Sequence, residues 1–130
     1  MPLSRVTSCF ALFIEPVTSE VLFVQQRSGK WSLPGGHKDP GETNTETLVR
    51  ECLEEIGFDV TGMEPAATLT VERKQGGALV SVFFSRPEVR IQNEIVRACW
   101  GNPDRPRPGT SKTVCKALVA LTALRESKRA

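Results

Sequence analysis

The chain has 130 residues, a formal net charge of +2, 39% hydrophobic residues and 25% charged residues. This is one domain's worth of sequence with the composition of an ordinary soluble globular protein, able to bury one core, so a single domain over residues 1–130 is expected. Its four cysteines are widely separated, with no CxxC pair and one His, which argues against a zinc site and favours reduced thiols in an intracellular protein.

The first apolar segment, Val6–Ile14, predicts a strand that is central in its sheet and covered on both faces, because almost every position is apolar. Its run CFALFI stops at Glu15 and Pro16, short of a signal core or a membrane span, so no membrane association is expected. Residues 1–8 contain one Arg and no acid, which leaves an organelle open beside the cytoplasm. Glu20–Gln26 predicts a second strand, paired with the first as a hairpin.

Residues 36–58 predict a glycine-rich turn that leads into a helix. The Gly35-Gly36 pair allows a backbone turn that other residues would resist, and Gly57 supplies a stop at the C-terminal end of the helix. Trp31, just before the turn, is expected to pack in the core or at its rim. The residues that can cap the start of the helix are Thr43, Asn44 and Thr45.

The expected helix carries carboxylates on one side and apolar residues on the other. Because successive helical residues are rotated by about 100°, Glu51, Glu54 and Glu55 share one face. Three like charges within one turn repel one another and favour a cation between them; Mg²⁺, or Mn²⁺ in its place, suits oxygen ligands. The alternative is a solvated acidic face. The apolar side is expected to consist of Leu48, Val49, Cys52, Leu53 and Ile56.

Beyond the helix the pattern returns to strands. Phe58–Val60 predicts the start of one strand, and Thr68–Arg73 with Leu79–Ser85 predicts a hairpin around KQGG. Ile95–Trp100 predicts a further short strand, followed by a loop over residues 101–111, which are rich in Gly and Pro.

From Lys112 the period becomes helical, which predicts a C-terminal helix of about four turns packed on the sheet. With a helix in the middle, a helix at the end and two faces of a sheet to cover, the chain is predicted to be a layered α/β domain. The apolar stripe of the last helix consists of Val114, Ala117, Leu118, Leu121 and Leu124.

Nine residues between Gly36 and Phe58 have a specific spacing. Glu42 follows Gly36 after five residues, Arg50 follows Glu42 after seven, and the segment closes with the run ECLEEIGF. This pattern resembles the signature of the Nudix hydrolases at every defined position, with Cys52 where the family usually has a larger aliphatic residue. The resemblance implies an α/β/α sandwich around a mixed β-sheet, and Mg²⁺-dependent hydrolysis of a nucleoside diphosphate linked to another moiety.

The resemblance also assigns roles to the signature residues by their positions. Arg50 would orient neighbouring carboxylates through charge-assisted hydrogen bonds, and Glu42 would be a structural partner of that network rather than a ligand. The metal ligands would be the backbone carbonyl of Gly36 and the carboxylates of Glu51, Glu54 and Glu55.

Residues outside the signature complete the expected site. Many relatives add an acidic residue from a loop before the last strand, as a further ligand or general base, and Glu94 is the best match here, ahead of Glu88. Glu51 competes with Glu94 for the role of base. Arg27, at the end of the second strand, is a candidate for contact with a substrate phosphate or else a solvated side chain, and His37 is expected to be a surface residue.

The resemblance narrows the substrate by exclusion. Members specific for dinucleoside polyphosphates tend to carry a Tyr after the signature, and this chain has none. Arg73 stands where the ADP-ribose group tends to have Pro, and the SQPWP-type segment of the NADH group is missing. Nucleoside triphosphates, standard or oxidised, remain. An alternative of another class is a nucleotide- or RNA-binding module that keeps the fold without turnover.

Charge is distributed unevenly along the chain. Residues 86–130 contain 10 Lys or Arg against 4 Asp or Glu, a net of +6, whereas residues 1–85 have a net of −4. A basic third beside an acidic metal site would attract a polyphosphate or the 5′ end of an RNA, so an RNA 5′-end pyrophosphohydrolase stays open, as does the oligomeric state. The other interpretation is a solvated surface. The residues concerned are Arg97, Arg105, Arg107, Lys112 and Lys116.

Overall fold

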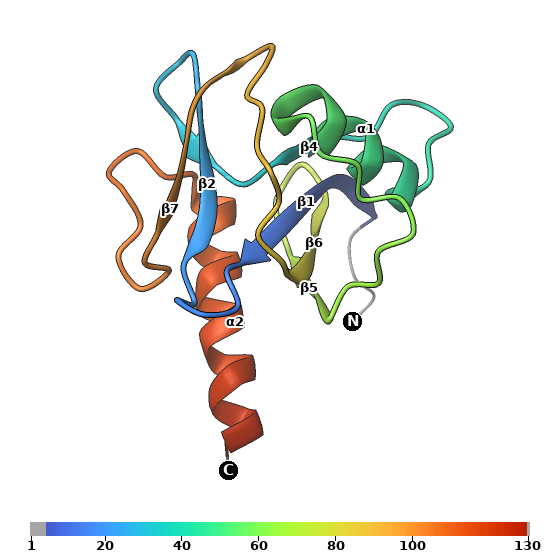
Figure 1. The fold of residues 1–130 in the computed structure, drawn as a ribbon. Helices are drawn as coiled ribbons and strands as arrows, with labels where there is room; N and C mark the ends of the chain where they lie inside the picture. The colour runs from blue at the N-terminus through green and yellow to red at the C-terminus, as the bar shows by residue number, and fades with distance from the viewer. Residues whose placement is uncertain (1–4, 130) are drawn as a thin grey trace.

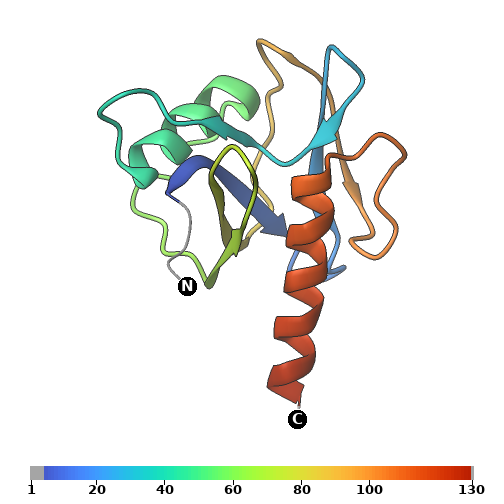
Figure 2. The same ribbon diagram turned by 180° about the vertical axis from the view of Figure 1, so that it is seen from behind.

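Seven strands and two helices form residues 5–129, the part of the chain that this computed structural model describes. The strands are β1 (Val6–Ile14), β2 (Val21–Gln26), β3 (Trp31–Ser32), β4 (Gly35–His37), β5 (Ala67–Val71), β6 (Gly77–Phe84) and β7 (Ile95–Gly101). The helices are α1 (Asn44–Ile56) and α2 (Lys112–Arg129). The two helices lie on opposite faces of the strands, as the two views show (Figure 1; Figure 2).

β1 is the centre of a mixed sheet, as its apolar sequence predicts. Along one edge it runs parallel to β6, from Val6 beside Gly77 to Ile14 beside Phe84, and β5 continues the sheet antiparallel to β6. Its other edge is shared, because β4 pairs with its first half and β2 meets its end. β2 then pairs antiparallel with β3 and β7. The sheet therefore has two parts that β1 joins.

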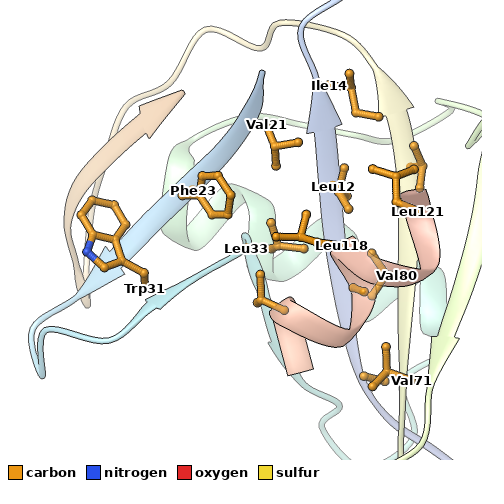
Figure 3. Close-up of a cluster of buried hydrophobic side chains, with 14 residues drawn as sticks. Leu12, Ile14, Val21, Phe23, Trp31, Leu33, Val71, Val80, Leu118 and Leu121 are labelled. Carbon is orange, nitrogen blue, oxygen red and sulfur yellow. The ribbon is translucent and has the colours of Figure 1, made fainter. Parts of the chain in front are cut away.

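Each face of the sheet has its own core. On one face α1 covers Phe13, whose ring stacks on Phe83 at 5.5 Å and meets Phe58 edge-on at 5.8 Å, measured between ring centroids. Complete burial of a side chain such as Phe13 contributes about 1.5–3 kcal/mol. On the other face α2 packs against β5 and shares a core with β1, β2 and β6 (Figure 3). The buried residues of α2 are Val114, Ala117, Leu118 and Leu121. The predicted α/β/α sandwich around a mixed sheet is confirmed.

The predicted hairpin of the first two strands exists only at its turn. Ile14 pairs with Val21, and beyond this point β2 leaves β1 and pairs with β7. The reason is that the edge of β1 is already occupied: β4 pairs with its residues 8–10, and Ala11 donates its N–H to the carbonyl of Pro34 at 2.8 Å. The short strand β4, which contains the Gly35-Gly36 pair expected to form a turn, thus displaces the expected partner.

The predicted strand at Phe58–Val60 is wrong, whereas the hairpin of β5 and β6 and the strand β7 are confirmed. The Asp59 carboxylate accepts the N–H of Thr61 at 2.9 Å, which turns the chain directly after α1. Phe58 and Val60 instead enter the core under α1 from this turn. The two residues are apolar because they pack in the core, and the hydrogen bond between Asp59 and Thr61 favours a turn over strand pairing.

α1 buries a narrower stripe than the sequence predicts. Leu53, expected in the core, is 42% exposed, and the polar Thr47 is fully buried instead. Thr47 can be buried because its hydroxyl donates to the Glu42 carboxylate at 2.9 Å, which satisfies the polar group. Residues four apart stack along one side of a helix, and the buried stripe accordingly consists of Leu48, Cys52 and Ile56.

α2 contains 18 residues, about five turns instead of the expected four. Leu124, the last member of its predicted stripe, is only partly buried, because this end of the helix extends past the sheet (Figure 2). Neither helix of residues 5–129 has the length and apolar character needed to cross a bilayer. All four cysteines are free thiols, with Cys52 and Cys115 on the helices as expected. The intracellular location stays a prediction.

Candidate active site

The signature helix α1 is fixed at both ends. The Thr43 hydroxyl accepts the N–H of Glu46 at 3.1 Å, and the Glu46 carboxylate accepts the N–H of Thr43 at 2.9 Å. This capping box satisfies two N–H groups that a helix start leaves unpaired. At the other end Gly57 adopts a left-handed conformation with φ 64° and donates its N–H to the carbonyl of Leu53. Thr43 and Gly57 were both among the predicted boundary residues.

Arg50 is the centre of a carboxylate cluster on α1. Its Nε and Nη2 donate to the two oxygens of Glu42, at 2.7 and 3.0 Å. Its Nη1 donates to Glu51 at 2.8 Å and reaches Glu54 at 3.4 Å. Asp39, which sequence reasoning did not single out, lies 3.4 Å from Nε. One guanidinium thus connects the turn before the helix with the carboxylates on it.

The two sides of this cluster stabilise each other's charge. Hydrogen bonds from Arg50 are the main cause that lowers the pKa of Glu42 to about 2, and the N–H of Asp39 and the hydroxyl of Thr47 also donate to this carboxylate. In return, the hydrogen bond to the Glu42 carboxylate is the main reason that the pKa of Arg50 is raised above its usual value. Glu42 and Arg50 therefore stay ionised at neutral pH and form a fixed frame.

Glu51 and Glu55, the carboxylates closer to the core, have raised rather than lowered pKa values. Burial raises the pKa of Glu51, against the opposing effect of Arg50. Burial also raises the pKa of Glu55 to about 8; the N–H of Gly35, which donates to Glu55 at 2.8 Å, acts in the opposite direction, while the charges of Glu51 and Glu54 add to the rise. Ionised carboxylates that are partly desolvated and close together favour the arrival of a cation.

β4 lies beside α1 (Figure 1), which brings the backbone of the signature turn close to the Glu51 carboxylate. A Cβ atom at Gly36 would lie 2.9 Å from the carboxyl carbon of Glu51, so only a glycine leaves room for this contact. The carbonyl of His37 accepts Nη2 of Arg50 at 2.9 Å. The His37 ring lies on the other side of the strand, with Nδ1 3.1 Å from the hydroxyl of Ser8. Turn and helix are thus joined through backbone atoms as well as side chains.

The donor set fits a hard divalent cation in kind and in place. Carboxylate and carbonyl oxygens are the ligands that Mg²⁺ prefers, and Glu51, Glu54 and Glu55 lie within one turn of helix beside β4. In the structure, however, the described residues contain no three metal-binding side chains that converge on one point. Arg50 holds Glu51 and Glu54, and a backbone N–H holds Glu55. These carboxylates would have to turn from their present partners to share one ion.

Arg27 and Glu94 lie together where β2 ends and β7 begins. The N–H of Arg27 donates to the carbonyl of Glu94 at 3.0 Å, and both side chains are exposed. The neighbouring Asn93 donates from its side chain to the carbonyl of Glu54 at 2.6 Å, which attaches this segment to the end of α1. Sequence reasoning missed Asn93. The one feature of the sequence that could have pointed to it is the residue type, since Asn tolerates the positive φ of 56° found here.

The five basic residues that the sequence singled out in the C-terminal third are all exposed. The guanidinium of Arg107 lies 4.9 Å from the centroid of the Trp31 ring, an arrangement typical of a cation–π contact. Trp31 itself is 6% exposed and belongs to the core under α2, as predicted. The five residues are Arg97 on β7, Arg105 and Arg107 in the loop, and Lys112 and Lys116 on α2.

A Glu42→Gln variant is expected to lose part of the acid dependence of stability. Because the pKa of Glu42 is depressed from 4.5 to about 2, its contribution is complete above pH 4.5 and disappears as pH falls through 2. Over that window the unfolded wild-type chain takes up about one more proton than the folded protein, and the variant should not. Urea unfolding followed from pH 5 to pH 2 measures the difference. Glu64→Gln, at an exposed loop position, is the control; equal slopes for all three proteins would contradict the assignment.

The sandwich and its capped, carboxylate-bearing helix define a Nudix-type α/β domain. The family model of the NUDIX domain matches residues 5–115, and the chain belongs to the Nudix hydrolase family. Members of this family typically depend on a divalent metal.

The chain is also similar to individual members of the family. A human 8-oxo-dGDP phosphatase is 40% identical over 92 residues, which cover 62% of this chain and 28% of the relative. A putative 8-oxo-dGTP diphosphatase from Bacillus subtilis (strain 168) is 44% identical over 43 residues, covering 32% and 29%. The crystal structure of the MutT protein from Methanosarcina mazei Go1 has a TM-score of 0.72 at 21% identity, over 98% of this chain and 99% of that one; it supports the fold alone. The chain spans less than a third of both curated relatives.

Proposed function

We propose that this Nudix domain hydrolyses a phosphoanhydride bond of a nucleoside diphosphate linked to another group, in a reaction that depends on Mg²⁺ or Mn²⁺. The observation that carries the proposal is the position of Glu51, Glu54 and Glu55 within one turn of α1, against the backbone of Gly36 and around the guanidinium of Arg50. A merely solvated acidic face would not require the partly buried pair of Arg50 and Glu42, or a glycine at the position where a side chain would collide with the Glu51 carboxylate.

The residues of the cluster divide the work between them. Glu51, Glu54 and Glu55, with the carbonyl of Gly36, would hold the metal ion. When bound, such an ion polarises phosphoryl oxygens and lowers the pKa of a coordinated water. Arg50 holds Glu51 and Glu54 beside the turn, from where they would rotate towards the ion. Arg50 is itself held by the Glu42 carboxylate, whose pKa is depressed so that it stays ionised.

Two carboxylates are candidates for the base that accepts a proton from the attacking water. The side chain of Glu51 is 14% exposed, and burial raises its pKa, which makes this carboxylate a stronger base than an exposed one. Glu94 is exposed at the start of β7, next to a segment that contacts α1. Arg27, whose N–H is bonded to the Glu94 carbonyl, is the candidate for contact with a substrate phosphate. Water attacks phosphorus, the bond to the bridging oxygen breaks, and the leaving phosphate takes the electron pair.

The substrate proposed is an oxidised guanine nucleotide. Sequence reasoning left nucleoside triphosphates, standard or oxidised, and the names of the two curated relatives refer to 8-oxo-dGDP and 8-oxo-dGTP. The exclusions from sequence left triphosphates, whereas the name of the human relative refers to a diphosphate, so the test includes both kinds of nucleotide. RNA 5′ ends remain the second candidate, on the strength of the exposed basic residues around the start of α2.

A substrate panel tests the proposal. The purified protein is incubated with 8-oxo-dGDP, 8-oxo-dGTP, their unoxidised counterparts, ADP-ribose, a dinucleoside polyphosphate and 5′-triphosphorylated RNA, with Mg²⁺, with Mn²⁺ and with EDTA. We expect a nucleoside monophosphate from an oxidised substrate and a loss of at least about 100-fold without metal. Reaction in ¹⁸O-water identifies the phosphorus attacked. Nucleotide retained without any product would favour the binding module, and preference for RNA would move the proposal to 5′-end removal.

A further inference from the structure

The C-terminal end of α1 is capped by a segment from far along the chain. A helix leaves its last four carbonyls without partners inside the helix. Here Ile56 accepts the N–H of Arg90 at 2.8 Å, and Glu55 accepts the N–H of Gln92 at 3.1 Å. The side chain of Gln92 donates to Leu53 at 3.1 Å. With Asn93 bonded to the Glu54 carbonyl, residues 90–93 donate to each of the four, and the Leu53 carbonyl also accepts the N–H of Gly57.

The shape of the helix end makes this contact possible. Gly57 ends α1, and a Cβ atom there would lie 2.9 Å from Nε2 of Gln92 and 3.2 Å from Cβ of Arg90. The missing side chain therefore leaves the space that residues 90–92 occupy. The conformation of Gly57, with φ 64°, also turns the chain away so that the carbonyls remain accessible. The helix end and the later segment fit each other closely.

Asn93 joins this cap to the two residues proposed to act on the substrate side. Its Nδ2 donates to the carbonyl of Glu54 at 2.6 Å, and its own carbonyl accepts Nη2 of Arg27 at 3.4 Å. The next residue, Glu94, accepts the backbone N–H of Arg27 at 3.0 Å. The positive φ of 56° at Asn93 sets the direction in which the chain continues to Glu94. Asn93 thus contacts α1 through its side chain and the residue after β2 through its backbone, two positions before β7 begins.

We propose that Asn93 is a positioning residue: its side-chain hydrogen bond to the end of α1 fixes Glu94 and Arg27 relative to the carboxylates on that helix. The inference rests on the proposed function and on Glu94 taking part in it. Asn93 acts through its neighbours and does not touch the substrate. Because a misplacement of about 1 Å at a reacting group can cost about 100-fold in rate, loss of this one bond should lower kcat by about 10- to 100-fold.

Three variants separate the side chain from the backbone. Asn93→Gly keeps the left-handed conformation without strain and removes the donor. Asn93→Asp keeps the size but points a carboxylate at the Glu54 carbonyl, so its kcat should be lower still. Asn102→Gly is the control, because Asn102 also has a local role, accepting the N–H of Asp104 at 2.8 Å, in the loop after β7. Circular dichroism and thermal unfolding check that each protein is folded at the assay temperature. If Asn93→Asp is unfolded, the test uses Asn93→Gly alone.

A double-mutant cycle with Glu94→Gln distinguishes positioning from general stability. If Asn93 acts by placing Glu94, the double variant should lose kcat within about threefold of the larger single loss, since the second change removes a group already misplaced. If Asn93 only supports the fold, Tm falls while kcat per folded molecule stays near wild type, or the two losses multiply; either result overturns the inference. A wild-type protein inactive on the whole panel would instead refute the proposed function.

Discussion

The Glu54→Gln variant is expected to lose about 1,000-fold in kcat/KM and to keep its fold. The carboxylate of Glu54 is one of three proposed to hold the metal, and an amide in its place keeps the size but gives up the charge and half of the oxygen donors. Its side chain is 49% exposed and its contact with Arg50 is 3.4 Å long, so little stability depends on it. Steady-state kinetics on the best substrate of the panel, with thermal unfolding beside it, measure both quantities.

The matched control is Glu126→Gln on α2. Glu126 is likewise an exposed glutamate on a helix, and α2 covers the opposite face of the sheet (Figure 2). Substitutions at exposed sites of this kind change stability by about 0.5 kcal/mol or less. The activity of Glu126→Gln should therefore stay within about twofold of wild type. Titration with Mn²⁺ followed by electron paramagnetic resonance should show weaker binding only for Glu54→Gln. Full activity in that variant would mean that the acidic face of α1 does not hold the ion.

The sequence predicts the parts of this fold that depend on local pattern. The central strand, the capped helix between Thr43 and Gly57, the β5–β6 hairpin and the apolar stripe of α2 all follow from periodicity and turn chemistry. The errors lie where tertiary contacts decide. β2 leaves β1 because β4 already occupies that edge. The residue pattern of β2 is the same whichever strand it pairs with, so the sequence does not predict this change of partner.

The candidate site shows the same division. The spacing of Glu42, Arg50 and Glu51 predicts that they meet, because all lie on or just before one helix, and they do. Asn93 contacts the same helix from 39 residues beyond Glu54, and no local pattern relates the two. The arrangement of the carboxylates is also a tertiary matter: sequence reasoning placed a cation among them, and in the structure the guanidinium of Arg50 partly fills that role.

The adjacent glycines Gly35 and Gly36 are expected to respond to alanine in opposite ways. Gly35 has φ 147°, and a Cβ atom there would lie 2.6 Å from Cα of Phe10 and overlap the backbone of Cys9. Backbone atoms in the middle of a sheet cannot move aside, so strain and overpacking together should cost about 3 kcal/mol or more. A domain of this size would then lose about 10 °C or more in Tm, and thermal unfolding measures the loss directly.

At Gly36 the obstacle is the end of a flexible side chain, since the new methyl group would lie 2.9 Å from the Glu51 carboxylate, and φ is not in the left-handed region. Gly36→Ala should therefore change Tm by only a few degrees, while turnover falls by about 10- to 100-fold as the carboxylate is displaced from its place beside the turn. The pair separates two functions of neighbouring residues: Gly35 lets β4 lie on β1, and Gly36 lets Glu51 approach the backbone. An unfolded Gly36→Ala protein, or a stable Gly35→Ala protein, would show that this division is wrong.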